Sequence, residues 1–289
     1  MKTIRLTTII ILALLFSARS MAQQGAARQQ SEAKSQQTDA NGKQLVVPLS
    51  EPGKPYKLNV NLVFGSIKVT SYEGKDVIID VTSSDSKRER PDREGNGMKR
   101  LSGGDNLDIT AHEKNNEVNI GSDMPLKAVT LNIKVPQGAT NIKLSTVNNG
   151  IIFASGLNGQ IEAENSNGSI ELKDVSGSVV ANTNNGNVTV ALRSVDPKAP
   201  MAFTTLNGNI DVTLPATIKA NVKARSERDN VYSDFEFTAE PSQAKTSKSA
   251  KDGMYRLTVE DWITGKIGGG GPEMMFKTMN GNIYIRKAK

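Results

Sequence analysis

Short runs of alternating apolar and polar residues follow one another along most of the chain from Leu45 onward. They include 58–64, 66–70, 77–81, 107–110 and 129–135, with Gly, Asn, Ser or Pro between them. Alternation with a period of two, bounded by turn-forming residues, predicts β-strands. No segment after the N-terminal leader has the periodicity of an amphipathic helix, so we expect an all-β protein.

The most regular part of the chain begins at Val147, where a glycine recurs every nine residues. These glycines are Gly150, Gly159, Gly168, Gly177 and Gly186, and an asparagine precedes each one except Gly177. Ile or Val stands two positions after each glycine, and Ala, Leu or Val four positions after it. Because Asn and Gly tolerate left-handed backbone angles, each unit predicts a tight turn followed by a strand with one apolar face. The unit returns at 207–212 and 280–285.

Two architectures could use such a turn. In a meander of hairpins, the residue three positions before each glycine would pair with the buried Ile or Val. Most residues at that position are not apolar, among them Asn165, Asp174 and Thr183. A solenoid is favoured because its turns are corners, and equivalent residues stack on the next coil instead of pairing across the turn.

The residue two positions before each glycine alternates between polar and apolar. The residues there are Asn148, Leu157, Ser166, Val175 and Asn184. This alternation predicts a single-chain β-solenoid with coils of roughly 18 residues and two sides. We expect Leu157 to stack on Val175, and Asn148, Ser166 and Asn184 to form a hydrogen-bonded ladder.

Three segments resemble a known family. Residues 131–138 read LNIKVPQG, 203–215 read FTTLNGNIDVTLP, and 276–285 read FKTMNGNIYI. They resemble the DUF4097 "putative adhesin" family of bacterial exported β-strand-repeat proteins, over about residues 58–289. The resemblance implies an exported β-solenoid and offers no catalytic motif to transfer. One departure is the polar stretch 223–252, which is expected to interrupt the repeats.

Residues 1–22 have the pattern of a cleaved secretory signal. Lys2 and Arg5 precede an apolar run from Ile9 to Phe16, and small residues surround a predicted cut after Ala22. The run is too short for a membrane anchor, which needs about 20 apolar residues. Residues 23–43 are predicted to be a disordered linker, and 44–289 the β-repeat domain. We therefore expect export to the periplasm or the cell surface, with no integral membrane span in the mature chain.

Composition narrows the partners and the chemistry. The full chain has 36 basic and 30 acidic residues, and removal of Lys2, Arg5 and Arg19 with the leader leaves a net charge of +3. So small an excess does not predict a nucleic-acid partner. The chain has no Cys, and His112 is its only histidine. Because His112 lies in a polar run, we interpret it as a surface residue rather than part of a Ser-His-acid or metal site.

Calcium and polysaccharide cleavage were the remaining chemical candidates. Calcium-binding nonapeptide rolls need an Asp in every turn, whereas Asp174 is the only Asp between Asn141 and Leu192. Glu162 and Glu171 occupy equivalent outward positions with Glu164 nearby, as acids do in some polysaccharide-cleaving β-helices.

The equivalent positions of the next two units are Val180 and Thr189, which are not acids. We therefore favour the interpretation that Glu162 and Glu171 are solvent-facing charged residues. Gly268–Gly271 precedes a strand and is interpreted as a loop, not a phosphate site. The aromatic residues Phe153, Trp262 and Tyr284 are interpreted as scattered, which leaves a carbohydrate module without support. We therefore expect no catalytic, cofactor-binding or metal-binding residues.

The favoured hypothesis is a non-catalytic protein of the cell envelope or surface, acting as a scaffold or an adhesion or interaction module. Its partner is an unidentified envelope, surface or protein component. A periplasmic accessory or sensor protein that binds an envelope component is the alternative, and a polysaccharide-active β-helix enzyme ranks third. Self-association through the open ends of the solenoid stays undecided.

Overall fold

The computed structural model describes residues 44–83, 108–122, 128–148, 150–239, 245–251, 254–260 and 262–289. The chain divides into two units, 1–46 and 47–289, and the account below concerns the second. The predicted signal (1–22) and the predicted linker (23–43) lie outside the described residues. None of the described residues is helical, so this part of the chain contains no helix that could cross a membrane.

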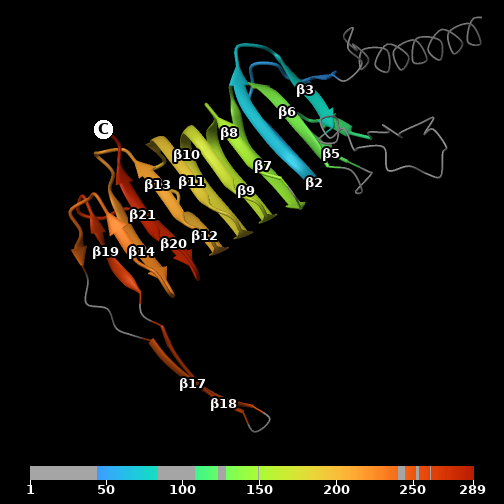
Figure 1. Cartoon of the computed structure of the whole chain (residues 1–289). Coiled ribbons are helices and arrows are strands. Elements are labelled where there is room, and N and C mark those ends of the chain that lie inside the picture. Colours follow the sequence, from blue (N-terminus) through green and yellow to red (C-terminus); the bar gives the residue numbers. More distant parts are fainter. Residues whose placement is uncertain are drawn as a thin grey trace, which may run out of the picture. The chain divides into compact units, whose positions relative to one another are not determined.

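Residues 47–289 form a β-solenoid, as the repeat predicts, with coils whose two sides are parallel β-sheets (Figure 1). We call them side 1 and side 2. In spatial order, the strands of side 1 are β4 (Thr110–Lys114), β5 (Glu117–Gly121), the first half of β2 (Tyr56–Tyr72), β7 (Ala139–Asn148), β9 (Asn158–Asn167), the second half of β10 (Ile170–Asn185), β12 (Met201–Asn207), β20 (Glu273–Thr278), β14 (Ala220–Ser226), β19 (Ile263–Ile267) and β16 (Thr238–Ala239).

The strands of side 2 lie in the corresponding order. They are β3 (Asp76–Ser83), β6 (Val129–Pro136), the second half of β2, β8 (Ile152–Ser155), the first half of β10, β11 (Val188–Val195), β13 (Ile210–Leu214), β21 (Ile283–Lys287) and β15 (Val231–Ser233). β17 (Lys245–Lys251) and β18 (Met254–Glu260) form a separate antiparallel hairpin. β1 (Gln44–Pro48) spans the boundary between the two units.

The predicted 18-residue coil is confirmed in the central repeats. Ile152, Ile170 and Val188 lie in register on three neighbouring strands of side 2. Nine residues of each coil lie on one side and nine on the other. The strands of neighbouring coils pair in parallel, as a solenoid requires and a hairpin meander does not. The step rises to 22 residues between Val188 and Ile210, because the turn at 196–199 adds residues to that coil.

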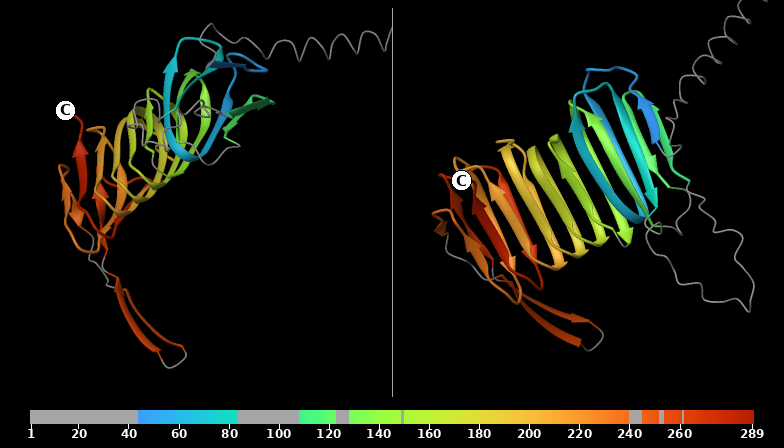
Figure 2. Two further views of the ribbon diagram at one scale, coloured as in Figure 1. Left: turned by 45° about the vertical axis from the view of Figure 1, so that its right-hand side comes forward. Right: turned by 45° about the horizontal axis from the view of Figure 1, so that its top comes forward.

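The ends of the solenoid depart from sequence order. β2 lies between the β5–β6 coil and the β7–β8 coil. At the other end, the C-terminal strands β20 and β21 lie between β12–β13 and β14–β15, as Figures 1 and 2 show. Antiparallel strands β3, β4 and β19 then follow the outermost parallel strands. The strand pairing at these places spans up to 85 residues of sequence.

The apolar positions of the repeat fill the interior. Ile152, Ile161, Ile170, Val179 and Val188 are each at most 2% exposed. Leu157 and Val175 are also buried, and they are neighbours through the Ser176 N–H, which donates to the carbonyl of Leu157 at 2.9 Å. Each such side chain contributes roughly 1.5–3 kcal/mol by burial, so the predicted register of the apolar face is confirmed.

One corner of the coils from β2 to β20–β21 repeats the same arrangement, and we call it the ladder corner. Its glycines are Gly65, Gly150, Gly168, Gly186, Gly208 and Gly281. A Cβ atom on Gly168 would collide with the carbonyl oxygen of Gly150, and the other glycines meet the preceding coil in the same way. The glycine of each pair is therefore required by the close approach of successive coils.

Buried side chains bind the carbonyl groups of these glycines. Thr183 Oγ1 donates to Gly168 O at 2.8 Å and Asn165 Nδ2 donates to Gly150 O at 3.0 Å. The same bond is made by Thr146, Thr205, Thr278 and Ser226. Asn165 and Thr183 are residues whose polarity argued against hairpins, and their position explains it: they satisfy backbone carbonyls inside the solenoid.

An exposed asparagine ladder runs along the same corner, but not through the predicted residues. Side-chain amides link Asn148, Asn167, Asn185, Asn207 and Asn280 at 2.6–3.1 Å. Ser166 and Asn184 were expected in it together with Asn148. That prediction was wrong, because β7 and β9 pair with a 19-residue step that places Asn148 beside Asn167.

The prediction for the polar stretch 223–252 also needs correction. Its first residues belong to β14, which pairs with β20, and β15 follows as a further part of the solenoid. Lys223 and Arg225 face outward on β14 and alternate with the buried Val222 and Ala224. The stretch looked like a loop because its strands alternate small apolar residues with charged ones.

Candidate functional site

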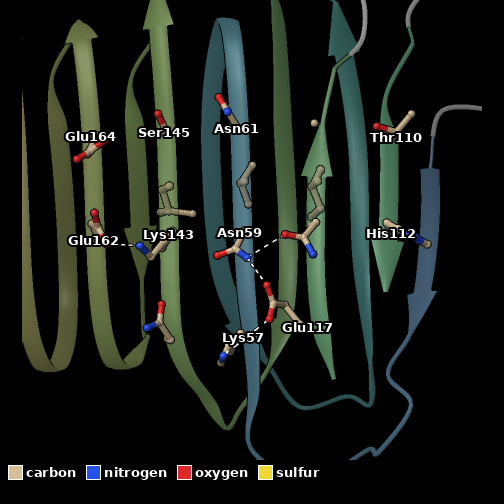
Figure 3. A pocket seen from close by; sticks show the side chains of 16 residues that line it. Lys57, Asn59, Asn61, Thr110, His112, Glu117, Lys143, Ser145, Glu162 and Glu164 are labelled. Atoms are coloured by element: carbon tan, nitrogen blue, oxygen red, sulfur yellow. Dashed lines mark hydrogen bonds and ion pairs between the residues drawn. The ribbon is translucent and has the colours of Figure 1, made fainter. Parts of the chain in front are cut away.

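The outer surface of side 1 is hollowed near the N-terminal end of the solenoid. The groove has a volume of about 830 Å³ and is lined by β2, β4, β5, β7 and β9 (Figure 3). Most of its surface comes from outward-facing residues, which alternate with buried ones along each strand. The lining is mainly amide and charged: Lys57, Asn59, Asn61, Thr110, His112, Glu117, Asn119, Asn141, Lys143, Ser145, Glu162 and Glu164.

An amide and carboxylate network forms the centre of the groove. Asn59 Nδ2 donates to Glu117 Oε1 and to Asn119 Oδ1, each at 2.9 Å. Lys57 Nζ lies 3.8 Å from the other oxygen of Glu117. Strand register produces this arrangement, since Asn59 pairs with Asn119 on one side of β2. The network fixes the orientation of the Asn59 and Glu117 side chains across two strands.

A second charged pair lies on the opposite side of β2. Lys143 Nζ on β7 and Glu162 Oε2 on β9 are 2.9 Å apart. The hydrogen bond and the attraction to Glu162, with a smaller contribution from Glu164, raise the pKa of Lys143 above its ordinary value. Lys143 is thus a stable ammonium donor and is not suited to act as a general base.

His112 lies at the edge of the groove on β4, where it is exposed and stands opposite Asn119. This confirms its interpretation as a surface residue. Within the described residues, no group of three or more His, Asp and Glu side chains is placed to hold a metal ion.

The structure separates the predicted carboxylate row. Glu162 pairs with Lys143 and Val180 on side 1, whereas Glu171 pairs with Phe153 and Thr189 on side 2. The prediction that Glu162 and Glu171 are equivalent was wrong, because the structural repeat is 18 residues and alternate nine-residue units face opposite directions. Glu164 does line the same groove as Glu162.

One of the aromatic residues interpreted as scattered has a stacked partner. The Tyr232 and Tyr284 rings stack with centroids 5.3 Å apart on side 2. The Arg286 guanidinium lies 5.1 Å from the Tyr284 ring and pairs with Asp211 at 2.8 Å.

Sequence reasoning missed the centre of the groove. Lys57, Asn59, Glu117 and Asn119 lie in two strands about 60 residues apart. Both strands alternate polar and apolar residues, which marks their polar side chains as outward. Nothing local in the sequence indicates that β5 pairs with β2.

Two solved structures are similar to the chain at low sequence identity. No curated protein matches the chain. The crystal structure of a "putative cell adhesion protein" from Clostridium sporogenes ATCC 15579 is 14% identical, with a TM-score of 0.42 over 85% of this chain and 99% of that one. That of a "putative adhesin" from Bacteroides fragilis NCTC 9343 is 11% identical, with a TM-score of 0.28 over 85% of this chain and 96% of that one. The Toastrack DUF4097 family model matches residues 26–286, and the chain belongs to this family.

Proposed function

We propose that this protein is a non-catalytic interaction module of the cell envelope or surface, and that the groove on side 1 receives an extended polar partner such as a glycan chain. The sequence pattern of residues 1–22 supports export. The observation that carries the proposal is the groove itself, an open surface of about 830 Å³ across five strands.

The lining suits a polyhydroxylated ligand. Each side-chain amide offers both donors and an acceptor, as sugar hydroxyl groups require. Asn61, Asn119 and Asn141 present amides from three different strands. Since adjacent strands lie about 4.8 Å apart, these groups are spread across the groove. The Asn59 amide holds Asn119 in place before any ligand binds, which lowers the entropic cost of binding.

The same groove is poorly arranged for hydrolysis. A carboxylic acid that donates a proton at neutral pH usually sits in an apolar pocket. The side chain of Glu162 is 40% exposed and ion-paired with Lys143. Binding therefore explains the groove better than glycoside cleavage.

A blocking substitution tests the proposal. Ser145 lies between Asn61 and Glu164 on neighbouring strands, so Ser145→Trp would fill the groove. Ser155→Trp is the matched control, because Ser155 is a half-buried, outward-facing serine on side 2. We expect the wild-type protein and Ser155→Trp to sediment with insoluble cell-wall glycan, and Ser145→Trp to lose at least about 90% of that binding, equivalent to 1.4 kcal/mol.

Equal sedimentation of both variants would contradict the groove as the binding site. The same incubation can be assayed for new reducing ends. We expect none, and a release of reducing ends that Glu164→Gln abolishes would replace the binding proposal with an enzymatic function.

A further inference from the structure

Four cations face outward from neighbouring strands at the other end of side 1. Lys223 and Arg225 lie on β14, Lys266 on β19 and Lys277 on β20, and we call them the basic cluster. Arg225 pairs directly with Lys277 in the strand register. Like charges opposite each other on adjacent strands destabilise a sheet, so the cluster has a cost that folding alone does not explain.

Trp262 holds two of these cations in place. Lys223 Nζ lies 4.4 Å from the centre of the Trp262 ring, and the Arg225 guanidinium carbon lies 5.8 Å from it. Arg225 Nη2 is also 3.4 Å from Glu227, and its side chain is only 15% exposed. Cation–π contacts and partial burial reduce the side-chain freedom that an incoming anion would otherwise have to restrict.

Two members of the basic cluster differ from several other cations on the solenoid faces. Lys57, Lys143 and Arg286 each form an ion pair with a carboxylate of a neighbouring strand. Within the described residues, neither Lys223 nor Lys277 has a carboxylate within ion-pair distance. Glu273 is the outward carboxylate of β20, and it stands opposite Asn221, one row from Lys223 and two rows from Lys277.

We propose that the basic cluster binds the acid groups of an anionic polysaccharide. The cations are spread over three adjacent strands spaced about 4.8 Å apart, which matches a polymer with repeated acid groups better than one small anion. Half-buried Met275, beside Lys223 in the register, gives an apolar surface between the charges for the faces of sugar rings. Trp262 is half-buried and engaged by cations, so it is not placed to insert into a lipid bilayer. This inference goes beyond the groove, because the basic cluster consists of other residues and would bind its partner through positive charge rather than through side-chain amides.

The protein carries its own reporter for this site, because Trp262 is its only tryptophan. We expect titration with polygalacturonate to change Trp262 fluorescence at low ionic strength, and added salt to reverse the change. Neutral dextran should produce no change. The double variant Lys223→Gln/Lys277→Gln should bind polygalacturonate about tenfold more weakly, since each exposed cation contributes a modest amount.

A second double variant controls for net charge. Lys173→Gln/Lys198→Gln removes the same two charges from positions outside both sites, on side 2 and in the turn at 196–199. It should bind polygalacturonate as the wild type does. Equal weakening in both double variants would overturn the proposal by showing a general charge effect. Binding only to phosphatidylglycerol vesicles or only to polyphosphate would overturn it in favour of those partners. Because Ser145→Trp leaves the cluster intact, failure of the groove proposal would not alter these results.

Discussion

The two corners of each coil are stabilised by different contacts. At the ladder corner, a glycine meets the preceding coil and a buried side chain binds its carbonyl in every coil from Gly65 to Gly281. At the opposite corner, Gly159 and Gly177 stack in the same manner, but the next coil places Val195 there. The register also shifts between Leu172 and Ser176, and Asp174 adopts a left-handed conformation with φ of 52°.

The two corners therefore have different roles in the solenoid. The ladder corner fixes the axial position of each coil through its close backbone contacts and internal hydrogen bonds, and it keeps this alignment although one extra residue lies between β7 and β8. The opposite corner absorbs changes in coil length, such as the turn at 196–199 that lengthens one coil to 22 residues. A solenoid can therefore change its length per coil without losing the alignment of its outer rows, which is what a repeated binding surface requires.

The largest expected effect is the loss of stability caused by alanine at a glycine of the ladder corner. Gly168→Ala would force a Cβ against the carbonyl of Gly150, which cannot move without displacing a coil. We expect a loss of about 3–5 kcal/mol in the free energy of unfolding. Gly156→Ala, at the opposite corner, meets only the rotatable hydroxyl of Ser71 and carries a φ of +70°. Its cost should be about 1–2 kcal/mol from backbone strain.

Chemical denaturation of both variants, followed by far-ultraviolet circular dichroism, measures the comparison. If the two substitutions cost the same, the ladder corner would have no special role in alignment.

Two buried hydroxyl groups on β10, one near each corner, allow a second comparison of the two corners. Thr183→Val keeps the side-chain shape but removes the donor to Gly168 O, leaving a buried carbonyl without that bond. The expected loss is about 1–3 kcal/mol. The hydroxyl of Ser176, at the opposite corner, is buried with no hydrogen-bond partner among the described residues. Ser176→Ala should therefore be neutral or slightly stabilising.

Thermal unfolding measured by calorimetry tests both expectations. The stability should fall for Thr183→Val and stay equal or rise slightly for Ser176→Ala. A destabilising Ser176→Ala as large as Thr183→Val would mean that Ser176 binds a group, such as a buried water, that supports the opposite corner.

The central fold was predictable because its information is local. The Asn-Gly unit, the apolar face around Ile170 and the two-sided coil all follow from spacings of nine or eighteen residues. The ends were not predictable. β2 and β20–β21 are each inserted between two coils that follow one another in the sequence but are distant from the inserted strands, and no local pattern specifies which parallel edge a strand joins.

The candidate sites follow the same rule. Outward positions such as Glu162 and Glu164 could be assigned from alternation alone. The groove needed the pairing of β2 with β5, and the basic cluster needed the pairing of β14 with β19 and β20. The wrong equivalence of Glu162 and Glu171 shows that a nine-residue sequence repeat can conceal an eighteen-residue structural one.

The smallest expected effect concerns the exposed asparagine ladder. Asn185 donates to Asn167 and accepts from Asn207, so Asn185→Ala removes two side-chain hydrogen bonds. Because these groups can bond to water when unpaired, the loss should be only about 0.5–1 kcal/mol. Asn184→Ala, one residue earlier on the same exposed strand end, should change stability by less than about 0.5 kcal/mol. Urea unfolding can resolve this difference when the two variants are compared at constant m-value. Equal values would show that the ladder follows from the alignment of the coils, and that the buried bonds to the glycine carbonyls alone set that alignment.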